Sequence, residues 1–140
     1  PRLAREICRT QEVLARFGIR PLIFRPPVGI TGPRLAGALA EFGLACVNFS
    51  CRAADFGNRR IVHLARRVLR QVRPGAIILL HDNSPRGRAR VEDWLAEVEE
   101  LIRGLKTAGY EVVPLSALIG RPVMEPVSAP GDFFLTPDRR

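Results

Sequence analysis

Apolar positions alternate along the chain between a helical spacing and short continuous runs. The helical spacing, with apolar residues three and four apart, predicts helices over residues 3–17, 33–42, 59–72 and 91–105. Between and after these segments lie short apolar runs that predict strands over residues 22–24, 44–49, 76–80 and 110–114. This alternation of helices and strands predicts an α/β fold with parallel strands.

Turn-forming residues delimit the predicted elements. Gly18, Gly43 and Gly109 follow three of the predicted helices, and Pro33 is suited to the first turn of another. Asn58 is positioned to cap the helix over residues 59–72. The strand over 76–80 is apolar throughout, which is typical of a parallel strand that is buried on both faces.

Proline recurs without a period from Gly120 onward, at positions 122, 126, 130 and 137. Such a segment is typical of an extended, poorly ordered terminus. We therefore expect one domain over residues 1–120 and a proline-rich tail over residues 121–140.

The formal net charge of +8 raises the question of nucleic-acid binding. Lys106 is the only lysine, so the other basic residues are arginines, and these lie singly or in pairs along predicted helices. Aromatic residues for base stacking make up only 6% of the chain. This pattern favours a solvated basic surface over a nucleic-acid partner. No apolar run reaches the roughly 20 residues that a membrane helix needs.

Polar residues of unusual character follow three of the predicted strands. The loop from Arg25 to Gly29 contains two prolines, the segment Cys51–Asp55 ends in a carboxylate, and His81–Asp82 follows the most apolar strand. In parallel α/β folds the loops at the carboxyl ends of strands carry the functional groups. We therefore expect the candidate site to be built from these loops.

Each of these residues has both a chemical and a structural interpretation. A guanidinium in a proline-stiffened loop, as at Arg25, can clamp a carboxylate, and the backbone N–H groups of Val28 and Gly29 can stabilise an oxyanion. The alternative is a proline turn with an exposed arginine. His81 is placed to act as a general acid, with Asp55 orienting its ring, although a histidine at a strand end is more often structural.

In this order the three segments resemble the motifs of the polysaccharide deacetylase family, the chitooligosaccharide deacetylase-like or NodB-homology domain. Arg25-Pro-Pro-Val-Gly29 resembles its R-x-P-x-G motif. Asp55–Phe56 stands where Asp–Trp is usual, and Leu79-Leu80-His81-Asp82 resembles L-x-H-D. The resemblance covers about residues 5–119.

The resemblance implies a distorted (β/α) barrel that hydrolyses N-acetyl or O-acetyl groups on a polysaccharide or oligosaccharide with the aid of a divalent metal, usually zinc. It implies that His81 is the general acid that protonates the leaving amine and that Asp55 orients it. It assigns Arg25 to hold the catalytic carboxylate, Val28 to offer its N–H to the oxyanion, and Leu79 to line the pocket for the acetyl methyl group.

Two motifs of that family are absent from this sequence. The T-F-D-D motif supplies the family's catalytic base and one metal ligand, and H-x-x-x-H supplies two further ligands. The only histidines here are His63 and His81, and no Asp-Asp pair occurs. We therefore expect the later portion of a deacetylase domain, forming a partial barrel without metal ligands and inactive by itself. The alternatives are a non-catalytic carbohydrate-binding or structural relative and a basic nucleic-acid-binding domain.

Overall fold

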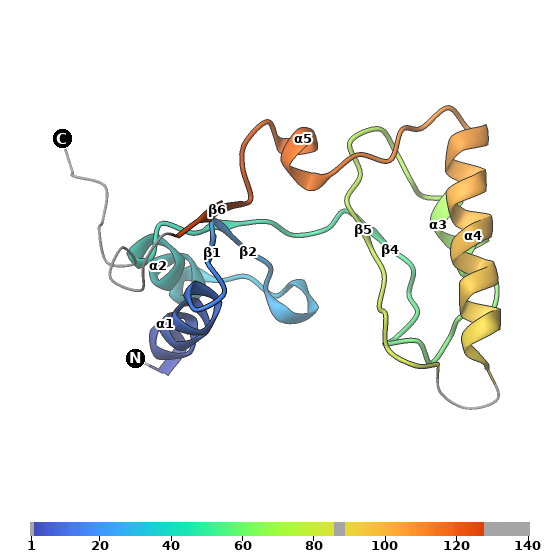
Figure 1. The fold of residues 1–140 in the computed structure, drawn as a ribbon. Coiled ribbons are helices and arrows are strands. Elements are labelled where there is room, and N and C mark those ends of the chain that lie inside the picture. Colours follow the sequence, from blue (N-terminus) through green and yellow to red (C-terminus); the bar gives the residue numbers. More distant parts are fainter. Residues whose placement is uncertain (1, 86–88, 128–140) are drawn as a thin grey trace. The chain divides into compact units, whose positions relative to one another are not determined.

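The computed structural model describes residues 2–85 and 89–127. Helices and short strands alternate along most of this length (Figure 1). The described residues divide into two compact units, one formed by residues 2–48 together with 119–127 and the other by residues 49–118. The α/β alternation that the sequence predicts is thus confirmed, whereas the sheets are partial and close no barrel among the described residues.

The first unit joins two helices to two pairs of strands. Its helices are α1 (Arg2–Ala15) and α2 (Pro33–Glu41). Strand β2 (Ile23–Phe24) pairs in parallel with β3 (Ala45–Cys46), and β1 (Ile19–Pro21) pairs antiparallel with β6 (Met124–Pro126). A small core centred on Ile7, Leu39 and Leu44 fills the space between the elements. A 3₁₀ turn, η1 (Pro27–Gly29), follows β2.

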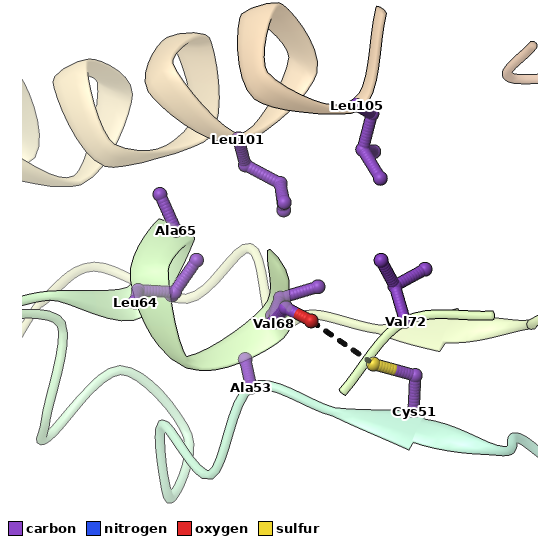
Figure 2. Close-up of a cluster of buried hydrophobic side chains, with 8 residues drawn as sticks. All are labelled: Cys51, Ala53, Leu64, Ala65, Val68, Val72, Leu101 and Leu105. Carbon is purple, nitrogen blue, oxygen red and sulfur yellow. Dashed lines mark hydrogen bonds between the residues drawn. The ribbon is translucent and has the colours of Figure 1, made fainter. Parts of the chain in front are cut away.

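The second unit packs two helices on one parallel pair of strands. Strand β4 (Cys51–Arg52) lies beside β5 (Ile78–Leu79), and α3 (Leu64–Leu69) lies against the long helix α4 (Val91–Thr107) (Figure 1). Side chains from α3, α4 and β4, and from the residues just after β4 and α3, meet in a single apolar cluster (Figure 2). Its members are Cys51, Ala53, Leu64, Ala65, Val68, Val72, Leu101 and Leu105. A short helix, α5 (Leu115–Ile119), follows.

The structure departs from the predicted strand over residues 110–114. No strand forms there, and the side chains of Val112 and Val113 are exposed. An apolar run becomes a strand only where a neighbouring strand is available for hydrogen bonding, and apolarity alone does not reveal that neighbour. The strand expected over residues 110–114 is therefore wrong.

The helix predicted over residues 59–72 is shorter in the structure, where α3 spans only Leu64–Leu69. The preceding residues include Phe56, Asn58 and His63 at positive φ, a conformation that an α-helix cannot continue through. Asn58 is consequently no helix cap but a buried residue of an irregular loop.

The proline-rich segment enters the fold at its beginning. Strand β6 falls within the segment expected as a tail, and its pairing with β1 includes an ion pair between Arg20 and Glu125 at 3.0 Å. Residues 128–140 of that segment lie outside the described residues. A search of the described residues finds no helix with the length and apolarity needed to cross a membrane.

Candidate active site

Strands β4 and β5 bring Asp55 and His81 to the same edge of the second unit. The two strands are parallel, with Arg52 opposite Leu79, and the N–H of Ala53 continues the pairing to the Leu79 carbonyl at 3.4 Å. Asp55 follows β4 by three residues and His81 follows β5 by two. Because parallel strands place their carboxyl ends together, both side chains emerge at one edge.

Asp55 contacts both the ring and the backbone of His81. Its Oδ1 lies 2.8 Å from His81 Nδ1, and its Oδ2 accepts the His81 backbone N–H at 3.2 Å. An ionised carboxylate can only accept, so Nδ1 carries the ring proton and Nε2 remains as the basic nitrogen. The Asp55 side chain is 3% exposed and the His81 side chain 39% exposed. The juxtaposition of Asp55 and His81 that the sequence predicts is thus present, with the carboxylate buried and the imidazole accessible.

Asn58, which the sequence suggests as a helix cap, belongs to this site. It is fully buried, and its Nδ2 donates to the His81 carbonyl at 2.8 Å and to the Asn83 carbonyl at 2.5 Å. The signal in the sequence is slight: asparagine tolerates the left-handed backbone conformation, and Asn58 has φ 62°.

Arg67 of α3 holds the loop that carries Asp55. Its Nε donates to the Ala53 carbonyl at 2.8 Å, its Nη2 donates to the Arg60 carbonyl at 2.7 Å, and its Nη1 donates to the Val62 carbonyl. Burial lowers the pKa of Arg67, and the charge of Arg60 adds to this effect, although a guanidinium stays protonated at neutral pH. The sequence pattern indicates only that Arg67 lies on a helix face. It does not reveal this role, because the acceptors of Arg67 are backbone carbonyls of a loop.

Two apolar side chains belong to the same strand ends. Phe56, next to Asp55, is 68% exposed and has φ 51°. Leu79 lies in β5, two residues before His81, and is half-buried. An exposed aromatic ring next in sequence to Asp55 offers an apolar surface to a bound molecule.

The residues of the Arg25–Gly29 loop belong to the first unit. Arg25 is exposed, and its Nε approaches the Val47 carbonyl at 3.5 Å, while Asn48 Nδ2 donates to the Gly29 carbonyl at 2.9 Å. Val28 is exposed, with φ 53°. The Gly29 N–H donates to the Pro26 carbonyl at 3.0 Å. The expectation that Gly29 offers this group to an oxyanion is therefore wrong, because the tight turn uses it.

Comparison with known proteins agrees with the motifs. The chain is 32% identical to a chitooligosaccharide deacetylase of Bradyrhizobium sp. over 105 residues, which are 70% of this chain and 48% of that protein. The chain is a homologue of the carbohydrate deacetylases. The Bc1960 peptidoglycan N-acetylglucosamine deacetylase superposes with a TM-score of 0.70 at 28% identity, over 86% of this chain and 56% of that one.

A family 4 carbohydrate esterase from Streptomyces lividans, solved in complex with acetate, superposes on this deacetylase homologue with a TM-score of 0.67 and 28% identity. That similarity covers 87% of this chain and 60% of the esterase. No protein-family profile matches the chain. The chain spans about half the length of the curated chitooligosaccharide deacetylases it matches.

Metal binding is a further property that the resemblance implies. The described residues of this deacetylase homologue contain no group of three or more His, Cys, Asp or Glu side chains placed to hold a metal ion. Zinc in proteins takes three or four such ligands. The described residues by themselves therefore do not fit a metal site, whereas Asp55 and His81 are suited to proton transfer.

Proposed function

We propose that the protein is a carbohydrate deacetylase in which His81 donates a proton to the leaving group. The observation that carries this proposal is the Asp55–His81 pair, with a buried carboxylate on Nδ1 and a ring that is 39% exposed. The relationship to deacetylases supplies the reaction class, and the pair supplies a group able to perform one step of it.

Amide hydrolysis requires such a group. When water adds to the acetyl carbonyl, a C–O bond forms, and the C–N bond then breaks to release acetate and an amine. An amine leaves only if its nitrogen is protonated as the bond breaks. Protonated His81 gives the Nε2 proton to that nitrogen, and Asp55 holds the ring so that Nε2 faces the reacting atoms.

The remaining assignments follow the motifs. Arg25 holds the carboxylate that acts as base, a group that the T-F-D-D motif supplies in the family and that this sequence lacks. Val28 offers its N–H to the oxyanion, and Leu79 lines the pocket for the acetyl methyl group. A divalent metal completes the site in the family, and its ligands are not among the described residues.

The substrate we propose is an acetylated polysaccharide or oligosaccharide built from N-acetylated sugars. The names of the relatives support this class, because they are a chitooligosaccharide deacetylase and a peptidoglycan N-acetylglucosamine deacetylase. The exposed Phe56 ring, next in sequence to Asp55, is suited to stack on a sugar face.

The test uses the protein expressed from its complete reading frame. Acetate release from acetylated chitooligosaccharides and from peptidoglycan fragments is measured for the unaltered protein and for His81→Asn. We expect His81→Asn to lower kcat by about 10²- to 10⁴-fold, the usual contribution of a general acid, while the metal content stays unchanged.

His63→Asn is the matched control, since His63 is exposed and asparagine accepts its φ of 57°. It is expected to keep full activity. Loss of metal from His81→Asn would show that His81 is a ligand and not an acid. Binding of the oligosaccharides without acetate release would favour a non-catalytic carbohydrate-binding protein.

A further inference from the structure

We propose that Asn58 is a positioning residue for His81, fixing the backbone that carries the imidazole through two hydrogen bonds from its side-chain amide. The proposal rests on the proposed deacetylase function for its catalytic consequence. Its structural part stands on the contacts of Asn58 alone.

The two hydrogen bonds of Asn58 bridge the turn that follows β5. Nδ2 donates to the carbonyls of His81 at 2.8 Å and Asn83 at 2.5 Å, which are two residues apart in the chain. Both acceptors are oxygens, so the orientation of the amide is settled: only the NH₂ group can face them. The amide thereby fixes the direction of the chain immediately after the imidazole.

Asn58 and Asp55 hold His81 from opposite sides of its backbone. Asp55 accepts the His81 N–H at 3.2 Å and binds the ring at 2.8 Å, whereas Asn58 binds the carbonyl. Both peptide groups of His81 are thus tied to one loop of four residues. Among the residues that the structure describes, the ring is held through Nδ1, so the position of Nε2 depends on the backbone staying in place. A displacement of about 1 Å at a reacting group can cost about 100-fold in rate.

The site requires asparagine for two separate reasons. The backbone of residue 58 has φ 62°, which asparagine and glycine adopt more readily than other residues. The side chain must also supply two donors in a fully buried position. Asn58 Oδ1 is buried and has no hydrogen-bond partner among the described residues, so the donors alone account for the amide's placement.

Two variants of the protein expressed from its complete reading frame separate these requirements. Asn58→Gly keeps the backbone conformation and removes the side chain, and Asn58→Asp keeps the shape but replaces the donors by a carboxylate. Both are expected to lower kcat by about ten-fold or more with KM within about two-fold, because His81 Nε2 loses its fixed position while substrate contacts remain.

Histidine-selective ¹⁵N NMR gives a readout that loss of stability alone does not move. In the unaltered protein we expect the His81 shifts of a ring protonated at Nδ1. In both variants the Nδ1 and Nε2 shifts are expected to move toward an average of the two tautomers. Scalar couplings across the hydrogen bonds from Asn58 Nδ2 to the two carbonyls test the contact in the unaltered protein, should a variant fail to fold.

Gln71→Ala is the matched control. Its side-chain amide also donates to two backbone carbonyls, those of Arg52 at 2.7 Å and Arg67 at 3.0 Å, but it is exposed and both acceptors lie outside the turn that carries His81. It should leave kcat and the His81 shifts unchanged. Unaltered His81 shifts in both Asn58 variants, or missing couplings in the unaltered protein, overturn the proposal. Absence of acetate release by the unaltered protein would refute the deacetylase function and leave the NMR result to decide the role of Asn58.

Discussion

At the scale of single residues, left-handed backbone conformations concentrate in the loop that carries Asp55. Ala54, Phe56 and Asn58 have φ of 51°, 51° and 62°, although none of them is glycine. Such conformations cost about 1–2 kcal/mol for residues with a side chain, and they persist where surrounding contacts impose them. The contacts here are the three hydrogen bonds from Arg67 and the two from Asn58. Strain concentrated beside an accessible imidazole supports the assignment of this loop to function.

The three free cysteines are expected to differ in reactivity at this same scale. Cys51 is buried in the core of the second unit, and burial raises the pKa of its thiol, so little thiolate forms there near neutral pH. A hydrogen bond to Glu12 raises the pKa of Cys8. Cys46 is exposed. Ellman's reagent should therefore label Cys46 first and Cys51 only after unfolding. Rapid labelling of Cys51, located by mass spectrometry, would contradict this order.

At the scale of elements, a side chain of α4 binds the free backbone N–H groups at the start of α3. His63 precedes α3, and its side chain makes no capping hydrogen bond to the helix. Glu97 of α4 accepts instead, with Oε1 2.6 Å from the His63 N–H and Oε2 2.9 Å from the Ala65 N–H. The free N–H groups at a helix start need such acceptors. The helix that supports Arg67, and through it the Asp55 loop, is thus anchored by its neighbour.

Replacing Glu97 by alanine is expected to lower the free energy of unfolding by about 1–2 kcal/mol, the usual cost of losing an N-terminal cap. Chemical denaturation monitored by circular dichroism measures the change. Glu99→Ala is the matched control on the same helix, because the exposed pair of Glu99 and Arg103 contributes only about 0.3–0.5 kcal/mol. Equal losses for the two variants would show that Glu97 is no cap.

At the scale of the whole molecule, segments far apart in sequence complete the first unit. Strand β6 pairs with β1 across more than 100 residues of chain, and backbone hydrogen bonds extend the pairing from Leu22 to Val123 and from Val127 to Gly18. Both bonds are 2.9–3.0 Å long. A proline-containing segment can serve here because the strand lies at an edge.

A chain ending at Gly120 should therefore be less stable than one ending at Val127. We expect the Leu22 amide to exchange its hydrogen faster in the shorter chain, because its acceptor on Val123 is removed. The thermal midpoint should fall as well. Equal exchange of Leu22 in both chains would show that β6 does not contribute to the unit's stability.

Local features of the fold follow from the sequence pattern. Apolar spacing predicts α1, α2 and α4, and the parallel strands β2, β3 and β5, because these patterns depend on near neighbours. The motifs around Arg25, Asp55 and His81, in this order, resemble those of the deacetylases. The same reasoning placed Asp55 beside His81, since parallel strands bring their ends together.

The way in which that pair is held depends on contacts between distant parts of the chain. Arg67, Asn58 and Glu97 act on backbone groups 5 to 34 residues away, and such acceptors and donors have no signature in the side chains along the sequence. The late start of α3 and the pairing of β6 depend likewise on contacts distant in the chain. The sequence shows which side chains are available for chemistry, whereas the backbone positions that orient those side chains arise only when the chain folds.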